Sequence, residues 1–320
     1  MTDLELSAGA WLEVLERDYL ASYVREGGAA VKVAVTAPDR AAALAASIGR
    51  AGQRHGFVTA QVDQSVLRLY AMDRLFNAVA AQIDWDGLAV TFMRAALEAH
   101  GYQLPDGSST AAEVARLNGV DPAQVWIRCE QILSRDVLHA YAMAKDFRFA
   151  MNQLCLAVVA GDDLQRETAE RVKEWLRGEL AGVGALRRAM IVEKINRYSA
   201  RAMLNSAAEW IGMAGRSGLL VVVDVTRFAT PGPWIGRDGI QTRPPSKIAV
   251  SDTYEMMRQC IDGTDEVSGM LLVFLSSPEF VTDERRGMKS YPALEMRLMD
   301  DVRDGSRANP FAPMVRITSA

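Results

Sequence analysis

The chain has 320 residues, of which 49% are hydrophobic and 24% charged, so it can bury a sizeable core and is not a largely disordered protein. Its net charge of -4 disfavours binding to nucleic acid through bulk charge. The three cysteines and three histidines lack metal-ligand spacing, so we expect reduced thiols and no bound metal. With no leader-like or membrane-spanning segment in this sequence, we predict a cytoplasmic protein that does not enter a membrane.

The first elements in chain order form a strand–turn–helix unit. Residues 3–25 have apolar side chains at helical spacing and predict an amphipathic helix. A strand at 31–35, a helix at 41–53 and a second strand at 56–63 follow. This order is expected of neighbouring parallel strands joined by a crossover helix.

The turn between the first strand and its helix reads TAPDRAAAL over residues 36–44. A phosphate loop in this place needs glycines, a Lys, and a Ser or Thr. Pro38 instead lacks a backbone donor, Asp39 adds negative charge, and Ala42 and Ala43 stand where Lys and the hydroxyl are expected. Taken alone, the turn also fits a connection that never bound phosphate.

The middle of the chain is predicted to be helical. Gly and Pro residues separate most of the helical patterns, which together predict an insertion over residues 67–215. The predicted helices cover residues 69–83, 85–100, 109–117, 122–160, 164–180 and 199–215.

Buried-strand patterns then return. Continuous apolar runs at 218–224 and 269–277, and a shorter run at 313–317, predict three more strands. They are joined by a Gly/Pro-rich loop at 226–246 and by helices at 252–261 and 291–302. The pattern predicts an α/β fold: a five-stranded parallel P-loop ATPase core, built from residues 1–66 and 216–320, around the helical insertion.

Two strand ends carry candidate nucleotide-site residues. Asp224 closes an apolar strand, where P-loop ATPases hold Mg²⁺, but Val225 follows it instead of the Glu that polarises water. A turn-forming Asp is the alternative. Ser276 and Ser277 end the next apolar run, where a polar residue can face the terminal phosphate, although Ser is common at strand ends.

Candidate interaction residues follow each of these strands. Trp234 in the loop at 226–246 predicts a contact surface, or else a buried anchor that pins the loop. Arginines beyond the second run stand where an arginine finger could reach a neighbouring subunit, or they are exposed side chains, two of them paired with adjacent carboxylates. These arginines are Arg285, Arg286 and Arg297.

The C-terminal half resembles a known family. The run containing PEF, DERRG and SYPAL, with GLLVVVDVTRF and NPFAPMVRI around it, is similar to the ATP-binding proteins of bacteriophage exclusion (BREX) systems. The resemblance implies an AAA+-like P-loop ATPase core with an inserted helical region, working beside other defence or DNA-processing subunits. The chain departs from the family at the phosphate loop and at the Asp-Glu pair, which is reduced to Asp224-Val225.

These observations favour a degenerate P-loop ATPase homologue without ATP hydrolysis of its own. It would act as a structural or regulatory subunit, in a homo- or hetero-oligomer with an active ATPase paralogue or a helicase-like partner, and would meet DNA only indirectly. One alternative is a subunit that keeps weak binding or hydrolysis of ATP with Mg²⁺, through Arg40, Arg50, Asp224, Ser276 and Ser277. Another is a DNA-binding module that uses Arg187, Arg188, Arg197 and Arg201.

Overall fold

The computed structural model describes residues 5–63, 71–106, 110–230, 234–235, 241–242, 244–299 and 308–318. The chain divides into two compact units. One contains Met1–Val79 and Ser217–Ala320, and the other is the intervening Ala80–Arg216. Helix α3 (Met72–Ala80) lies at the division between them.

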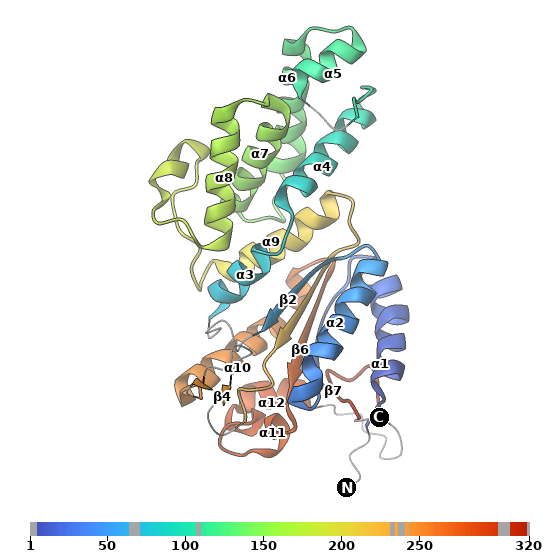
Figure 1. The fold of residues 1–320 in the computed structure, drawn as a ribbon, viewed down its shortest axis with the longest axis vertical. Coiled ribbons are helices and arrows are strands. Elements are labelled where there is room, and N and C mark those ends of the chain that lie inside the picture. The colour runs from blue at the N-terminus through green and yellow to red at the C-terminus, as the bar shows by residue number, and fades with distance from the viewer. Residues whose placement is uncertain are drawn as a thin grey trace. The chain divides into compact units, whose positions relative to one another are not determined.

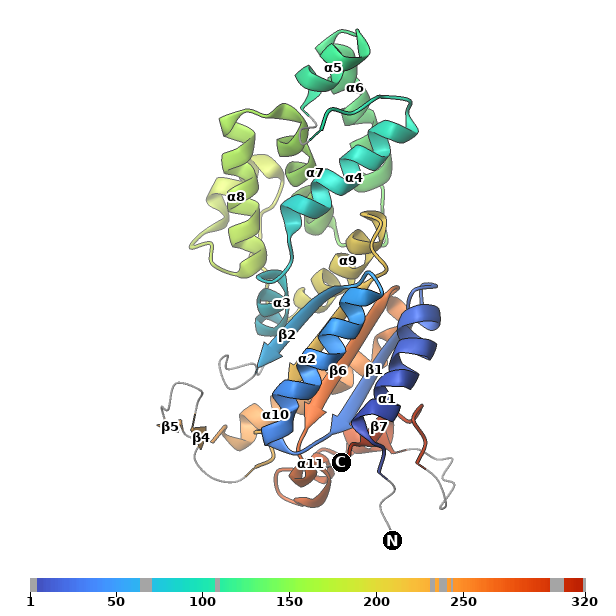
Figure 2. The same cartoon turned by 45° about the vertical axis from the view of Figure 1, so that its right-hand side comes forward.

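The first unit is built on a parallel sheet in the order β2-β3-β6-β1-β7 (Figure 2). The predicted five-stranded parallel sheet of a mixed α/β protein is therefore confirmed. Its strands are β1 (Ala29–Val35), β2 (Val58–Asp63), β3 (Leu219–Asp224), β6 (Met270–Ser276) and β7 (Met314–Arg316).

The N-terminal helices cover one face of this sheet (Figures 1 and 2). α1 (Ala8–Val14) continues into a π-helical stretch, Leu15–Tyr23, and α2 (Pro38–Arg54) packs beside them. The helices bury Trp11 and other apolar side chains against alternate residues of the strands. Gly52 allows the close approach of α2, because a Cβ there would lie 2.4 Å from Leu220 Cδ2.

The opposite face of the sheet is covered by α10 (Lys247–Asp262), with α12 (Pro292–Leu298) packed on α10. The short α11 (Pro278–Thr282) follows β6. The predicted helix at 291–302 is borne out to Leu298, and its last residues, 300–302, lie outside the described part of the chain.

The stretch predicted as a loop over residues 226–246 contains two short strands. β4 (Trp234–Ile235) pairs antiparallel with β5 (Gln241–Thr242). The loop prediction was therefore incomplete, because two-residue strands are too short to leave an alternating pattern in a sequence rich in Gly and Pro.

The second unit is helical. Aromatic contacts join its helices: Trp85 lies 6.0 Å from Phe147 and Phe92 lies 4.9 Å from Trp210, measured between ring centroids. Among the described helices, none is both long and apolar enough to cross a membrane. The α-helices of this unit are α4 (Trp85–Ala99), α5 (Ala111–Asn118), α6 (Pro122–Ile132), α7 (Lys145–Ala160), α8 (Asp163–Arg177) and α9 (Ala200–Met213).

The single helix predicted over residues 122–160 was wrong. α6 passes into a π-helical turn, Leu133–Leu138, and the chain then turns before α7 begins at Lys145. The break is held by residues distant in sequence, since the backbone N–H of Ala144 donates to Ser206 Oγ at 2.8 Å. Arg148 also donates to the carbonyl of Leu138 and lies over the ring of Tyr141.

Candidate functional site

The turn after β1 is the first candidate, because α/β proteins place their ligands at the carboxyl ends of parallel strands. Only Thr36 and Ala37 separate β1 from α2, which begins at Pro38. The N–H of Thr36 donates to the carbonyl of Ser276 at 2.8 Å, and that of Arg40 to the carbonyl of Ala37 at 3.0 Å. Pro38 has no N–H to donate.

These bonds bear on phosphate binding. A phosphate loop works through backbone N–H groups that are free to point at the ligand. Here two N–H groups of the turn are used within the protein, and the carboxylate of Asp39 stands in the first turn of α2. Arg40 is exposed on the same turn, and Arg50, farther along α2, donates to Ser47 Oγ at 3.0 Å. The turn therefore does not fit a nucleotide phosphate held in the usual way.

Asp224 at the end of β3 is bound by its own turn. Its Oδ1 accepts hydrogen bonds from the Thr226 backbone N–H at 2.9 Å and from Thr226 Oγ1 at 2.7 Å. Val225, where a catalytic Glu would stand, is buried, and its N–H donates to the carbonyl of Leu275 at 2.8 Å. These contacts match the turn-forming alternative for Asp224 and place an apolar side chain at the following position.

A second carboxylate stands beside Asp224. Asp63 at the end of β2 is its direct partner in the parallel register. Burial raises the pKa of Asp224, and the charge of Asp63 raises it further, while the hydrogen bonds from Thr226 act in the opposite direction. The sequence analysis did not single out Asp63 as a site residue; an Asp ending each of two adjacent strands was the available signal.

Ser276 and Ser277 lie at the end of β6 and are both fully buried. Among the described residues, neither hydroxyl has a hydrogen-bond partner. Unpaired buried hydroxyls are uncommon, and each costs free energy that a ligand or partner group could recover. Glu279 Oε2, in the following helix α11, is likewise buried without a partner among the described residues.

The strand pleat separates Ser276 from Asp224. Asp224 follows Leu220 and Val222, which pack on the face covered by α2. Ser276 follows Leu275, which faces α2, and so belongs to the opposite face. The structure brings the two residues to the same edge of the sheet but assigns them to different faces.

Arg285 and Arg286 have different environments. The backbone N–H groups of both donate to Asp283 Oδ1 at 2.8 Å. The guanidinium of Arg286 turns inward and donates to the carbonyl of Pro245 at 2.7 Å, with weaker contacts to Phe228 O at 3.5 Å. Arg285 is exposed and its side chain has no ion-pair partner among the described residues. Arg286 therefore ties the two ends of the loop at 226–246, whereas Arg285 is available at the surface.

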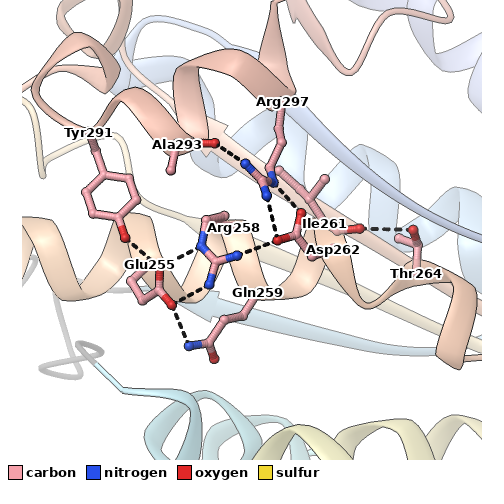
Figure 3. A network of polar contacts seen from close by, with 9 residues as sticks. All are labelled: Glu255, Arg258, Gln259, Ile261, Asp262, Thr264, Tyr291, Ala293 and Arg297. Carbon is pink, nitrogen blue, oxygen red and sulfur yellow. Dashed lines mark hydrogen bonds and ion pairs between the residues drawn. The ribbon is translucent and has the colours of Figure 1, made fainter.

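Arg297 belongs to a network between α12 and α10 (Figure 3). Its guanidinium donates to both carboxylate oxygens of Asp262 and, at 2.7 Å, to the carbonyl of Ala293. Arg258 links Asp262 to Glu255. All three nitrogens of the Arg297 guanidinium therefore donate to partners within the protein.

The same network strongly lowers the pKa of Glu255. Hydrogen bonds from Arg258 lower the pKa of Glu255 to about 2, with further bonds from Tyr291 at 2.6 Å and Gln259 at 2.8 Å. Arg258 and Glu255 are a quarter to a third exposed, so water screens their attraction. The network is a structural tie between two helices that cover the sheet.

The remaining predicted residues lie elsewhere. Trp234 is in β4, and its side chain falls outside the described part of the structure. Arg187 and Arg188 are exposed on a 3₁₀ turn of the helical unit, while Arg197 lies over the ring of exposed Tyr198. Arg201 is in the first turn of α9.

Within the described ranges, no group of three or more His, Cys, Asp and Glu side chains is placed to hold a metal ion.

Comparisons with known proteins give one family. The family model described as "BREX system ATP-binding protein BrxC/D" matches residues 43–319. The matched range begins after β1 and the turn that follows it. No curated protein and no solved structure matches the chain.

Proposed function

Because the chain belongs to the family of BREX system ATP-binding proteins BrxC/D, we propose that it is a subunit of an anti-phage defence complex that keeps the family's core without ATP hydrolysis of its own. Its role would be structural or regulatory, beside an active ATPase paralogue or a helicase-like partner. The helical unit would be an inserted domain of the same subunit.

The sheet supports the proposed P-loop core. Numbered among themselves in chain order, its five strands are arranged 2-3-4-1-5. This is the strand order of the AAA+ type of P-loop ATPases. All five strands are parallel, so their carboxyl ends meet at one edge, where such enzymes bind nucleotide.

The turn at Thr36 and Ala37 is the observation that carries the proposed loss of hydrolysis. It leaves a two-residue connection where a phosphate cradle would be needed, with the N–H of Thr36 bonded to the carbonyl of Ser276 and the N–H of Arg40, in α2, bonded to that of Ala37. Each charge-assisted hydrogen bond to phosphate contributes about 1.5–3 kcal/mol, so losing several of them removes most of the affinity for a nucleotide. Val225 supports the same proposal, because an apolar side chain cannot polarise water.

Calorimetry of the purified chain with ATP and Mg²⁺ tests this proposal. In a buffer of about 0.15 M ionic strength, where exposed charges are largely screened, we expect no saturable heat up to about 1 mM nucleotide, which corresponds to binding weaker than about 4 kcal/mol. A Kd in the micromolar range would overturn the proposal, and single-turnover hydrolysis would then measure what activity is kept.

Co-expression with a neighbouring gene that encodes an intact glycine-rich loop tests the subunit role. We expect the two proteins to purify together and the partner's ATPase rate to depend on the presence of this chain. Separate elution with an unchanged rate would exclude a regulatory subunit of that partner.

A second candidate function rests on Ser276 and Ser277. Their hydroxyls at the strand end are buried and lack partners in the part of the chain that the structure describes, so a bound nucleotide could satisfy them. Weak ATP binding through this edge is therefore the alternative, and Ser276→Ala distinguishes it. The substitution should abolish any heat seen with ATP if the hydroxyl contacts the nucleotide, and leave it unchanged otherwise.

A further inference from the structure

A cavity of about 190 Å³ lies between the start of α10 and the segment that follows α11. Two stretches of chain, far apart in sequence, converge on it. The described residues that line the cavity are Lys247, Val250, Ser251, Arg285, Arg286 and Ser290.

Positive charge exceeds negative charge around the cavity. Three of the described lining residues are cationic and none of these is acidic. Lys247 and Arg285 have no ion-pair partner among the described residues, and nearby Glu284 pairs with Lys289 at 3.7 Å. Backbone hydrogen bonds from Arg286 and Arg285 lower the pKa of the Asp283 carboxyl, and the charges of both arginines lower it further, so three cations meet one nearby carboxylate. The remaining like charges repel one another, and a bound anion would relieve that repulsion.

The groups around the cavity are arranged for an oxyanion. Lys247 is the first residue of α10, a 16-residue helix whose amino-terminal end carries partial positive charge. Arg286 is held in place by the carbonyl of Pro245 at 2.7 Å, so part of the positive charge is fixed before any ligand arrives. The exposed fork of Arg285 and the hydroxyl of exposed Ser251 add donors, whereas the hydroxyl of Ser290 already donates to the carbonyl of Gly287 at 2.7 Å.

The size of the cavity limits the ligand. Its volume equals that of about six water molecules at ~30 Å³ each, which suits a single phosphate group with some of its hydration. A duplex presents its phosphates along a convex backbone that does not enter a small hollow. We propose that this cavity binds a terminal phosphate group of a small molecule, either inorganic phosphate or the end phosphate of a nucleotide.

The described residues that line this anion site include neither Asp224 nor any residue of the turn after β1, so the site does not depend on a phosphate loop. It is formed by surface arginine and lysine side chains and the amino-terminal end of α10. It can therefore exist whether or not the proposed pseudo-ATPase function is correct.

Titration calorimetry in a phosphate-free buffer of low ionic strength tests the site with inorganic phosphate, ATP and a short duplex DNA as separate probes. We expect phosphate and ATP to bind with a Kd below about 1 mM, with affinity falling as salt is added. Lys247→Met and Arg285→Met should each weaken that binding by about tenfold or more, since each removes a charge-assisted hydrogen bond. Circular dichroism and the melting temperature would establish that both variants are folded.

Lys289→Met is the matched control. It removes a neighbouring cation that already has a carboxylate partner and does not line the cavity, so phosphate binding should not change. Arg40→Met controls for binding at the turn after β1.

Three results would overturn the proposal. The first is absence of saturable heat with phosphate and ATP, and the second is binding of the duplex alone. The third is loss of phosphate binding in Arg40→Met with retention in Lys247→Met, because the anion would then bind at the turn.

Discussion

Asp63 and Asp224 are register partners at the ends of two adjacent parallel strands, with the second carboxylate partly buried. Like charges so placed disfavour ionisation of the more buried one. The pair therefore makes the sheet edge sensitive to pH, with no ligand needed.

The substitution Asp224→Asn should stabilise the protein near neutral pH. Because the folded-state pKa of Asp224 is raised above its ordinary 3.8, the folded state holds this proton more tightly than the unfolded state. The contribution to stability is present below pH 3.8 and is lost as the pH rises through the raised value. An amide in this place would avoid that loss while still accepting hydrogen bonds from Thr226. Urea unfolding from pH 3.5 to 8 should show a variant more stable by roughly 1 kcal/mol at neutral pH, with the difference closing in acid. If the difference in unfolding free energy between variant and wild type did not change with pH, this explanation would be contradicted.

Removing either buried serine hydroxyl at the end of β6 should not destabilise the isolated chain. Ser276 and Ser277 have no hydrogen-bond partners within the described ranges, so Ala at either position removes an unsatisfied group and should leave stability unchanged or raise it by about 1 kcal/mol. Ser206→Ala is the control, because that hydroxyl donates to Ala202 and accepts from Ala144. It should cost about 1–2 kcal/mol in chemical denaturation. Equal losses at all three sites would mean that the hydroxyls of β6 have partners in solution.

Glu255→Gln should flatten the acid limb of the stability curve. The folded pKa of Glu255, about 2, lies below its ordinary 4.5, so its stabilising contribution is present above pH 4.5 and is lost as the pH falls towards 2. Solvent screening limits this contribution to about 1 kcal/mol. Denaturation at pH 2, 3, 4.5 and 7 should show a wild-type advantage at pH 7 that disappears at pH 2. Glu284→Gln, at a side chain that is 82% exposed, should give a difference close to zero throughout.

Gly218→Ala should severely destabilise the sheet. Gly218 has φ of +143°, and a Cβ there would lie 2.3 Å from the carbonyl oxygen of Gly269, which neighbouring strands hold in place. Backbone strain and the clash together should cost about 2–4 kcal/mol. Gly215→Ala is the matched control: φ is +77° but the space around it is open, so strain alone should cost about 1 kcal/mol. Similar melting temperatures for the two variants would rule out the clash.

The strands β3 and β6 could be predicted because they are buried on both faces. The apolar runs ending at Asp224 and Ser277 are not interrupted by polar residues, and a glycine precedes each of them. Such continuous runs indicate strands buried on both faces. Strand order is a different matter, since nothing local to β1 indicates that β6 and β7 will flank it. The sequence analysis accordingly predicted five parallel strands and no order for them.

Side-chain partners were the least predictable feature. The helix break before Lys145 depends on Ser206, and no Gly or Pro marks it in the sequence. Arg285 and Arg286 are adjacent and chemically identical, yet one faces solvent and the other bonds Pro245. Nothing in the sequence around Lys247 indicated that it lines a cavity, because the other wall is formed by a segment almost 40 residues later.

The position of β1 constrains how the protein folds. This early strand pairs with β6 on one side and β7 on the other, so neither of its edges can be satisfied until the last part of the chain has been synthesised. β2 likewise waits for β3, which follows the whole helical unit. Contacts of such long range slow folding and leave apolar strand edges open to aggregation in the meantime. We therefore expect the nascent chain to need chaperone protection until synthesis is complete, and refolding in vitro to be limited by assembly of the sheet and not by formation of the helices.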